Sequence, residues 1–110
     1  MEIKITKRQL LKTGMFNWEF WKISGRIYND DKTKYRKFRF VVDFDANDIC
    51  SYFDCDSYTK KQHDEYLDEA VCGVICYIND FDDTKEFHKE CNRTIHSYNE
   101  RNKPANSYYY

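Results

Sequence analysis

The chain has 110 residues, of which 34% are charged and 18% are aromatic, and its formal net charge is −1. This length fits one domain, and no run approaches the ~20 apolar residues of a membrane-spanning helix. The N-terminus has no apolar core of the kind found in signal peptides, so we expect a cytoplasmic protein whose thiols stay reduced and which has no membrane partner.

The charges are segregated along the chain. Residues 1–42 carry eleven Lys/Arg and four Asp/Glu, whereas residues 43–90 carry four Lys/Arg and fourteen Asp/Glu. A basic first part and an acidic middle predict two faces, each suited to a charged partner.

The first residues predict a short strand followed by a short helix. Residues 2–5 alternate between charged and apolar side chains, as in a strand. Thr6 and Gln9 have the spacing of a capping box, which predicts a helix that ends before Gly14.

Residues 16–44 predict a long antiparallel hairpin. Residues 16–28 are rich in aromatic side chains, residues 29–33 are turn formers, and residues 34–44 alternate clearly between apolar and charged positions.

The second half of the chain predicts a loop and two helices. Residues 45–58 are rich in Asp and Ser, and we expect a loop there. Thr59 and Gln62 form a second capping box, which predicts a helix to about Ile78, and Asp83 marks the start of a helix that ends near Arg101. Together these elements predict one α+β domain over residues 1–103, with a small antiparallel sheet packed against two α-helices and a loose tail over 104–110.

Four of the five cysteines have the spacing of a structural zinc site. Cys50 and Cys55 lie in the predicted loop, and Cys72 and Cys76 are one turn apart on the predicted helix, away from its apolar stripe. Two ligand pairs of this kind predict a zinc-stapled fold with a closed four-sulfur site, which leaves no open position for metal catalysis.

Other arrangements of these residues remain open. The cysteines can instead be buried thiols, and one of His63, His88 or His96 can replace a cysteine as ligand. Cys91 falls in the apolar stripe of the last helix, so we expect it in the core. A Cys91–His88 pair has no orienting carboxylate or oxyanion hole, and the sequence has no phosphate-binding glycine loop, so we expect no enzyme.

Both charged regions are candidate binding surfaces. Cations and rings are interleaved along the hairpin, as single-stranded nucleic acid requires, although outward lysines on a strand are also ordinary. The cations are Lys22, Arg26, Lys32, Lys34, Arg36, Lys37 and Arg39, and the rings are Trp18, Phe20, Tyr28 and Tyr35. An acidic surface can instead occupy a groove built for DNA phosphates. Its candidate contact residues are Glu65, Asp68, Glu69, Asp80, Asp82 and Asp83.

With these features in view, the chain resembles the small phage-encoded anti-CRISPR proteins of Gram-positive hosts. The resemblance rests on size, on a Lys-, Asn- and Tyr-rich composition, and on two segments, NWEFWKISGRIYNDDKTKYRKFRFVVDF and DEYLDEAVCGVICYINDFDD. It covers no signature motif. It implies a non-enzymatic inhibitor that binds the type II (II-A) CRISPR effector nuclease in the host bacterial cytoplasm and blocks target DNA loading or cleavage. Cysteine-bound metal is uncommon in that group, so the four cysteines depart from it. The alternative is a zinc-stapled nucleic-acid-binding protein that uses the basic hairpin.

Overall fold

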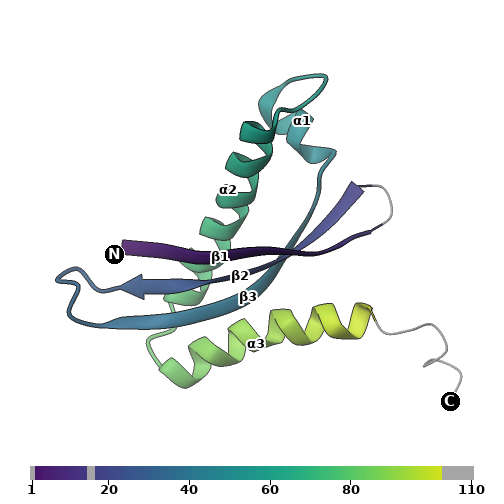
Figure 1. The fold of residues 1–110 in the computed structure, drawn as a ribbon. Helices are drawn as coiled ribbons and strands as arrows, with labels where there is room; N and C mark the ends of the chain where they lie inside the picture. Colours follow the sequence, from purple (N-terminus) through teal and green to yellow (C-terminus); the bar gives the residue numbers. More distant parts are fainter. Residues whose placement is uncertain (1, 15–16, 103–110) are drawn as a thin grey trace, which may run out of the picture.

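A computed structural model describes residues 2–14 and 17–102 of the chain. It confirms an α+β fold in which a three-stranded antiparallel sheet packs against helices (Figure 1). In chain order the elements are β1 (Glu2–Thr13), β2 (Trp18–Tyr28), β3 (Tyr35–Asp45), α1 (Asp48–Phe53), α2 (Lys60–Asn79) and α3 (Thr84–Arg101). The predicted tail, 104–110, and Phe16 at the start of the predicted hairpin lie outside the described residues.

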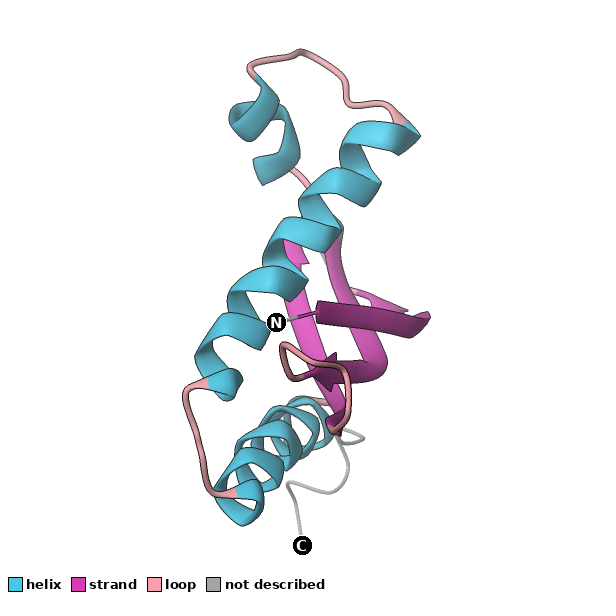
Figure 2. Cartoon of the chain, turned by 90° about the vertical axis from the view of Figure 1, so that its left-hand side faces the viewer, coloured by secondary structure: helices cyan, strands magenta, loops and turns pink. Residues whose placement is uncertain are grey.

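The sheet is a simple meander in the order β1-β2-β3. The predicted hairpin is confirmed over the described residues, with Trp18 opposite Asp45 at one end and Tyr28 opposite Tyr35 at the other. α2 crosses one side of the sheet and α3 runs along β3 (Figures 1 and 2). We call the side that α2 covers the inner face and the opposite side the outer face.

The predicted helix after Thr6 is wrong, because β1 continues as one strand to Thr13. Its register against β2 shifts between Ile5 and Lys7 and again between Leu10 and Lys12. Each shift inserts one extra residue, which reverses the alternation of inward and outward side chains beyond it. Because the alternation of apolar and polar residues is interrupted, the strand cannot be recognised from the sequence pattern. Thr6 and Gln9 have the spacing of a helix N-terminus by chance.

The first of these bulges lies beside Gly25, where β1 and β2 approach very closely. A Cβ atom on Gly25 would lie 2.3 Å from the Lys4 carbonyl oxygen and 2.7 Å from the Phe38 ring. Only glycine fits such an approach of two backbones. The absence of a side chain at Gly25 therefore permits the close approach of β1 and β2 at this bulge.

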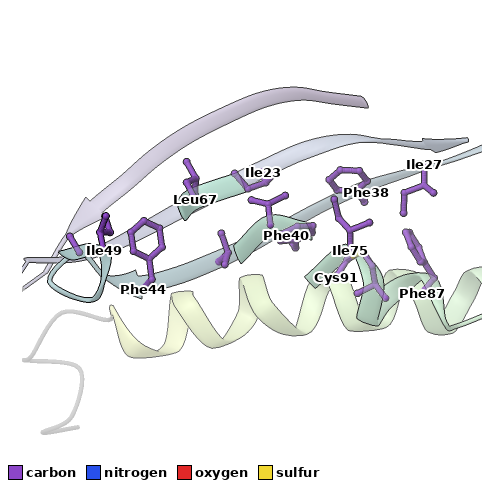
Figure 3. Packing of buried hydrophobic residues seen from close by; sticks show 14 residues of the cluster. Ile23, Ile27, Phe38, Phe40, Phe44, Ile49, Leu67, Ile75, Phe87 and Cys91 are labelled. Atoms are coloured by element: carbon purple, nitrogen blue, oxygen red, sulfur yellow. The ribbon is translucent and has the colours of Figure 1, made fainter. Parts of the chain in front are cut away.

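The core lies between the inner face and the helices, as Figure 3 shows. The strands contribute alternate residues, α2 contributes a stripe at helical spacing, and α3 contributes Phe87 and Cys91. The prediction that Cys91 lies in the core is confirmed, since it is 2% exposed. α3 also covers the free edge of β3, where the Val41 amide donates to the Thr94 hydroxyl at 2.9 Å.

The helix limits follow local signals. Thr59 and Gln62 form the predicted capping box, and the Asp83 side chain accepts a hydrogen bond from the Lys85 amide at the start of α3. The predicted loop over 45–58 is wrong in part, because residues 48–53 form α1, whose Ile49 is fully buried in the core. Within the described residues no helix has both the length and the apolar character needed to cross a membrane.

Candidate functional site

Cations gather on the outer face of the sheet, in rows that run across the strands. Lys4, Arg26 and Lys37 lie side by side on β1, β2 and β3, and Lys7, Ser24 and Arg39 form the next row. Gln9, Lys22 and Val41 form a third row. Adjacent strands are about 4.8 Å apart, so the charges within a row are close neighbours. We call the six cations the basic face: Lys4, Lys7, Lys22, Arg26, Lys37 and Arg39.

The bulge in β1 brings Lys7 into this surface. Beyond the extra residue Thr6, Lys7 pairs with Ser24 on the outer face, while Arg8 pairs with Ile23 on the inner face. Arg8 thereby reaches Asp68 of α2, with 3.1 Å between the Arg8 Nε and the Asp68 carboxylate. Reasoning from the sequence missed Lys4 and Lys7, because only strand pairing places them beside the hairpin.

Among the described residues, the six cations of the basic face have no carboxylate beside them that would neutralise their charge. Lys4 opposite Arg26 and Arg26 opposite Lys37 are like-charge pairs, which destabilise a sheet when they face each other directly. Among the described residues, no carboxylate lies within salt-bridge distance of any of the six. A surface that keeps this repulsion is suited to an anionic ligand that relieves it.

The aromatic residues of the hairpin divide into two groups. Tyr28 and Tyr35 lie at the end of the basic face, with their ring centroids 5.5 Å apart. Phe20 is buried under α3, where it contacts Tyr98, and the Trp18 indole donates to Asp43. Of the four rings predicted to be available for stacking, the tyrosine pair therefore borders the cations.

Arg36 belongs to the fold and not to the basic face. It points inward, donates to the Phe81 carbonyl oxygen at 2.6 Å and to the Asn79 side chain at 2.9 Å, and lies over the Phe87 ring. It thereby ties β3 to the connection between α2 and α3.

A shallow groove of about 540 Å³ separates the basic face from α3. Arg26, Lys37 and Arg39 line one wall, and His88 and Asn92 of α3 line the other. The groove extends the cationic surface toward side chains that can donate and accept hydrogen bonds.

The predicted acidic residues of α2 lie on the side of the sheet opposite to the basic face, whereas Asp82 lines a groove beside Tyr28 and Tyr35. Glu65 and Glu69 are exposed one turn apart on α2, and Asp80 and Asp82 are exposed near its C-terminus. Carboxylates beside each other, and beside the negative end of a helix dipole, repel. Of the six predicted contact residues, Asp68 pairs with Arg8 and Asp83 caps α3, so these two also have structural roles.

The structure separates the four predicted zinc ligands into two pairs. The Cys55 amide donates to the Cys50 carbonyl oxygen, and the Cys55 sulfur lies 4.0 Å from the Gln62 side chain at the start of α2. Cys72 follows Gln62 by ten residues, which is about 15 Å along a helix. Cys72 and Cys76 are exposed, and the described part of the chain contains no cluster of three or more His, Cys, Asp or Glu suited to a metal. Zinc binding by all four sulfurs therefore stays a prediction.

His63 joins β2 to α2 through two carboxylates. Its Nε2 lies 2.8 Å from Glu19 and its Nδ1 lies 3.0 Å from Asp64, and the side chains of His63 and Glu19 are only 15% and 14% exposed. Burial lowers the pKa of His63, but the hydrogen bonds and charges of Glu19 and Asp64 outweigh burial and raise it. Trp21 also donates to Glu19, at 2.9 Å. His63, Glu19 and Asp64 thus connect β2 to α2, and we call these three side chains the joint. His88 and His96, by contrast, are exposed.

Comparison with known proteins supplies no relative from which a role can be transferred. No family model, no curated protein and no solved structure matches the chain. The function must therefore be argued from the two charged faces.

Proposed function

We propose that the chain is a non-enzymatic binding protein that holds nucleic acid on its basic face. The observation that carries the proposal is the row Lys4–Arg26–Lys37, where three cations face one another across three strands without a carboxylate. Phosphate groups supply the missing negative charges at closely spaced intervals. Each lysine or arginine that meets a phosphate releases a condensed counterion, which favours binding.

The open geometry of the surface supports this assignment. No helix crosses the outer face of β1 in Figure 1, and α3 covers β2 near its start, where Phe20 contacts Tyr98. An exposed sheet face with rows of cations accommodates an extended backbone, whereas the exposed acidic side chains of α2 repel it. The ligand therefore meets the molecule from one side.

The test is a salt titration with a fluorescently labelled oligonucleotide. We expect log Kd to rise linearly with log salt, and Lys37→Gln to weaken binding and reduce the slope by about 1. The matched control is Lys61→Gln, which removes an exposed lysine from α2 and should leave both quantities unchanged. A wild-type chain that binds no oligonucleotide at low salt refutes the proposal.

The exposed carboxylates of α2 favour a second candidate function, inhibition of a type II CRISPR effector nuclease. Glu65 and Glu69 have no cation within salt-bridge distance among the described residues, and they belong to α2, which lies on one side of the sheet (Figure 2). Such a surface would occupy a channel that normally holds DNA phosphates.

This second proposal requires a direct assay of the nuclease. The wild-type chain should co-elute with the nuclease on a sizing column and block DNA cleavage at molar excess. The double variant Glu65→Gln/Glu69→Gln should inhibit less, while Glu86→Gln on α3 should inhibit normally. Full cleavage at molar excess of wild-type chain rejects the proposal for that nuclease.

Zinc binding by Cys50, Cys55, Cys72 and Cys76 stays a separate proposal, supported by their spacing alone. Cys55 lies beside the start of α2, whereas Cys72 and Cys76 lie in the second half of that helix. Elemental analysis of purified chain decides the matter. One zinc per chain that is lost in Cys72→Ser supports the site, whereas a metal-free chain of equal stability rejects it.

A further inference from the structure

The tyrosine pair at the end of the basic face defines which form of nucleic acid fits. Tyr28 and Tyr35 are directly opposite each other in the last register pair of β2 and β3. They share the outer face with Arg26 and Lys37, which occupy the next outward positions along the same strands. The cation rows therefore begin at two aromatic rings.

Tyr35 is held in place and remains accessible. The Arg26 guanidinium carbon lies 4.9 Å from the centroid of the Tyr35 ring, and an Arg26 Nη1 donates to the Tyr28 hydroxyl at 3.5 Å. Tyr35 is nevertheless 48% exposed. A ring that is oriented from one side and open to solvent is suited to stacking with a planar group.

A second groove adjoins these rings at the tip of the hairpin. Its volume is about 580 Å³, and its lining includes Tyr28, Tyr35, Lys34 and Asp82. An ammonium and a carboxylate beside a stacking ring can form hydrogen bonds with the edge of a base. Along β3 the ring of Tyr35 is thus followed within about 13 Å by the cations Lys37 and Arg39, and the base-edge groups lie beside the ring.

We propose that the basic face binds single-stranded nucleic acid, with one unpaired base stacked on Tyr35 and the backbone running along the cation rows. In a duplex the bases are already paired and stacked, so Tyr35 can reach only a terminal base pair. An unpaired strand offers every base to the ring. This inference rests on the proposed nucleic-acid binding and adds to it the form of the ligand.

The chain offers a matched pair of variants for the test. Tyr35→Leu removes the ring at the basic face, and Tyr77→Leu makes the same change on α2, where Tyr77 is 51% exposed and contacts one other ring, that of Phe81. Both changes occur at half-exposed positions, so both variants should fold, and circular dichroism checks this.

Fluorescence anisotropy then compares four probes with the wild-type chain and both variants. The probes are single-stranded DNA and single-stranded RNA of one sequence, about 12 nucleotides long, the corresponding DNA duplex, and inorganic polyphosphate as competitor. We expect the wild type to bind a single strand more tightly than the duplex. Tyr35→Leu should weaken single-strand binding roughly 5- to 150-fold, without changing the polyphosphate affinity, and Tyr77→Leu should change neither. The DNA and RNA arms identify which strand is preferred.

The outcomes separate this inference from the proposal on which it rests. Equal affinity for single strand and duplex, or unchanged single-strand binding by Tyr35→Leu, overturns the single-strand inference and leaves nucleic-acid binding intact. If the wild type binds none of the four probes at low salt, both fail.

Discussion

Two glycine-to-alanine changes test the close approach of β1 and β2 beside the bulge that aligns the cation rows. Gly25 lies beside the β1 bulge, and a Cβ atom there would lie 2.3 Å from a backbone oxygen and 2.7 Å from an aromatic carbon. Gly73 is exposed in the middle of α2, and a Cβ atom there would have no neighbour within 4 Å. The same added methyl group should therefore have opposite effects at the two positions.

The expected magnitudes differ in sign. Since the Lys4 carbonyl oxygen cannot give way without moving β1, we expect Gly25→Ala to lower the free energy of unfolding by about 3 kcal/mol or more. Gly73→Ala should raise it by about 0.8–1.0 kcal/mol, because alanine is the better helix former. At roughly 4–8 °C per kcal/mol for a domain of this size, Tm should fall by more than about 12 °C in the first variant and rise by about 3–8 °C in the second.

Urea denaturation followed by circular dichroism measures both effects, and a thermal scan checks the sign. The Gly73→Ala control shows that the assay detects a gain as well as a loss. If Gly25→Ala is as stable as the wild type, β1 does not approach β2 this closely at Gly25. The register that places Lys4 and Lys7 beside the hairpin would then be wrong.

Three further predictions concern the joint, the sheet edge and the thiols. Because the pKa of His63 is raised in the folded chain, its contribution to stability is full below about pH 6.5 and is lost as the pH rises through the raised value. Urea denaturation at several pH values should show this loss of stability for the wild type and for His96→Gln. The variant His63→Gln should not show it. Thr94→Val leaves the Val41 amide without its acceptor, so the free energy of unfolding should fall by about 1–3 kcal/mol. The control Ser97→Ala, on the exposed side of α3, should change the free energy of unfolding little. If Thr94→Val is as stable as the wild type, α3 does not cover the edge of β3 through this hydrogen bond. Under native conditions a thiol reagent should modify Cys72 and Cys76 first and Cys91 only after unfolding, as mass spectrometry of digested protein can check, since burial both shields Cys91 and raises the pKa of its thiol.

Local signals in the sequence were sufficient to predict part of the fold. The capping box of Thr59 and Gln62 uses atoms three residues apart, and the alternation of β3 is continuous, so both elements could be identified from short windows. β1 could not, because its two bulges arise from pairing with β2 and interrupt the alternation. α1 was missed for a similar reason, since its helix is stabilised by burial of Ile49 in a core that only the folded chain contains.

The candidate site could likewise be predicted only where its residues are close together in the sequence. Arg26, Lys37 and Tyr35 were recognised as part of a basic aromatic hairpin because they are close in sequence. Lys4 and Lys7 joined them only through the register of β1. For the cysteines, spacing identified two pairs but gave no distance between them, because that distance depends on where α1 docks along α2.

The opposite placement of the two charged faces has a consequence for any complex with a polyanion. The net charge of the protein is only −1, so a distant phosphate chain neither attracts nor repels it strongly. The separation of its charged faces nevertheless gives it a preferred orientation on approach. Once docked through the sheet, each copy turns the carboxylates of α2 toward solution. A nucleic-acid strand covered with bound protein would then have an acidic outer surface. This surface would repel the acidic faces of further molecules, so that only a single row of protein binds along the nucleic acid.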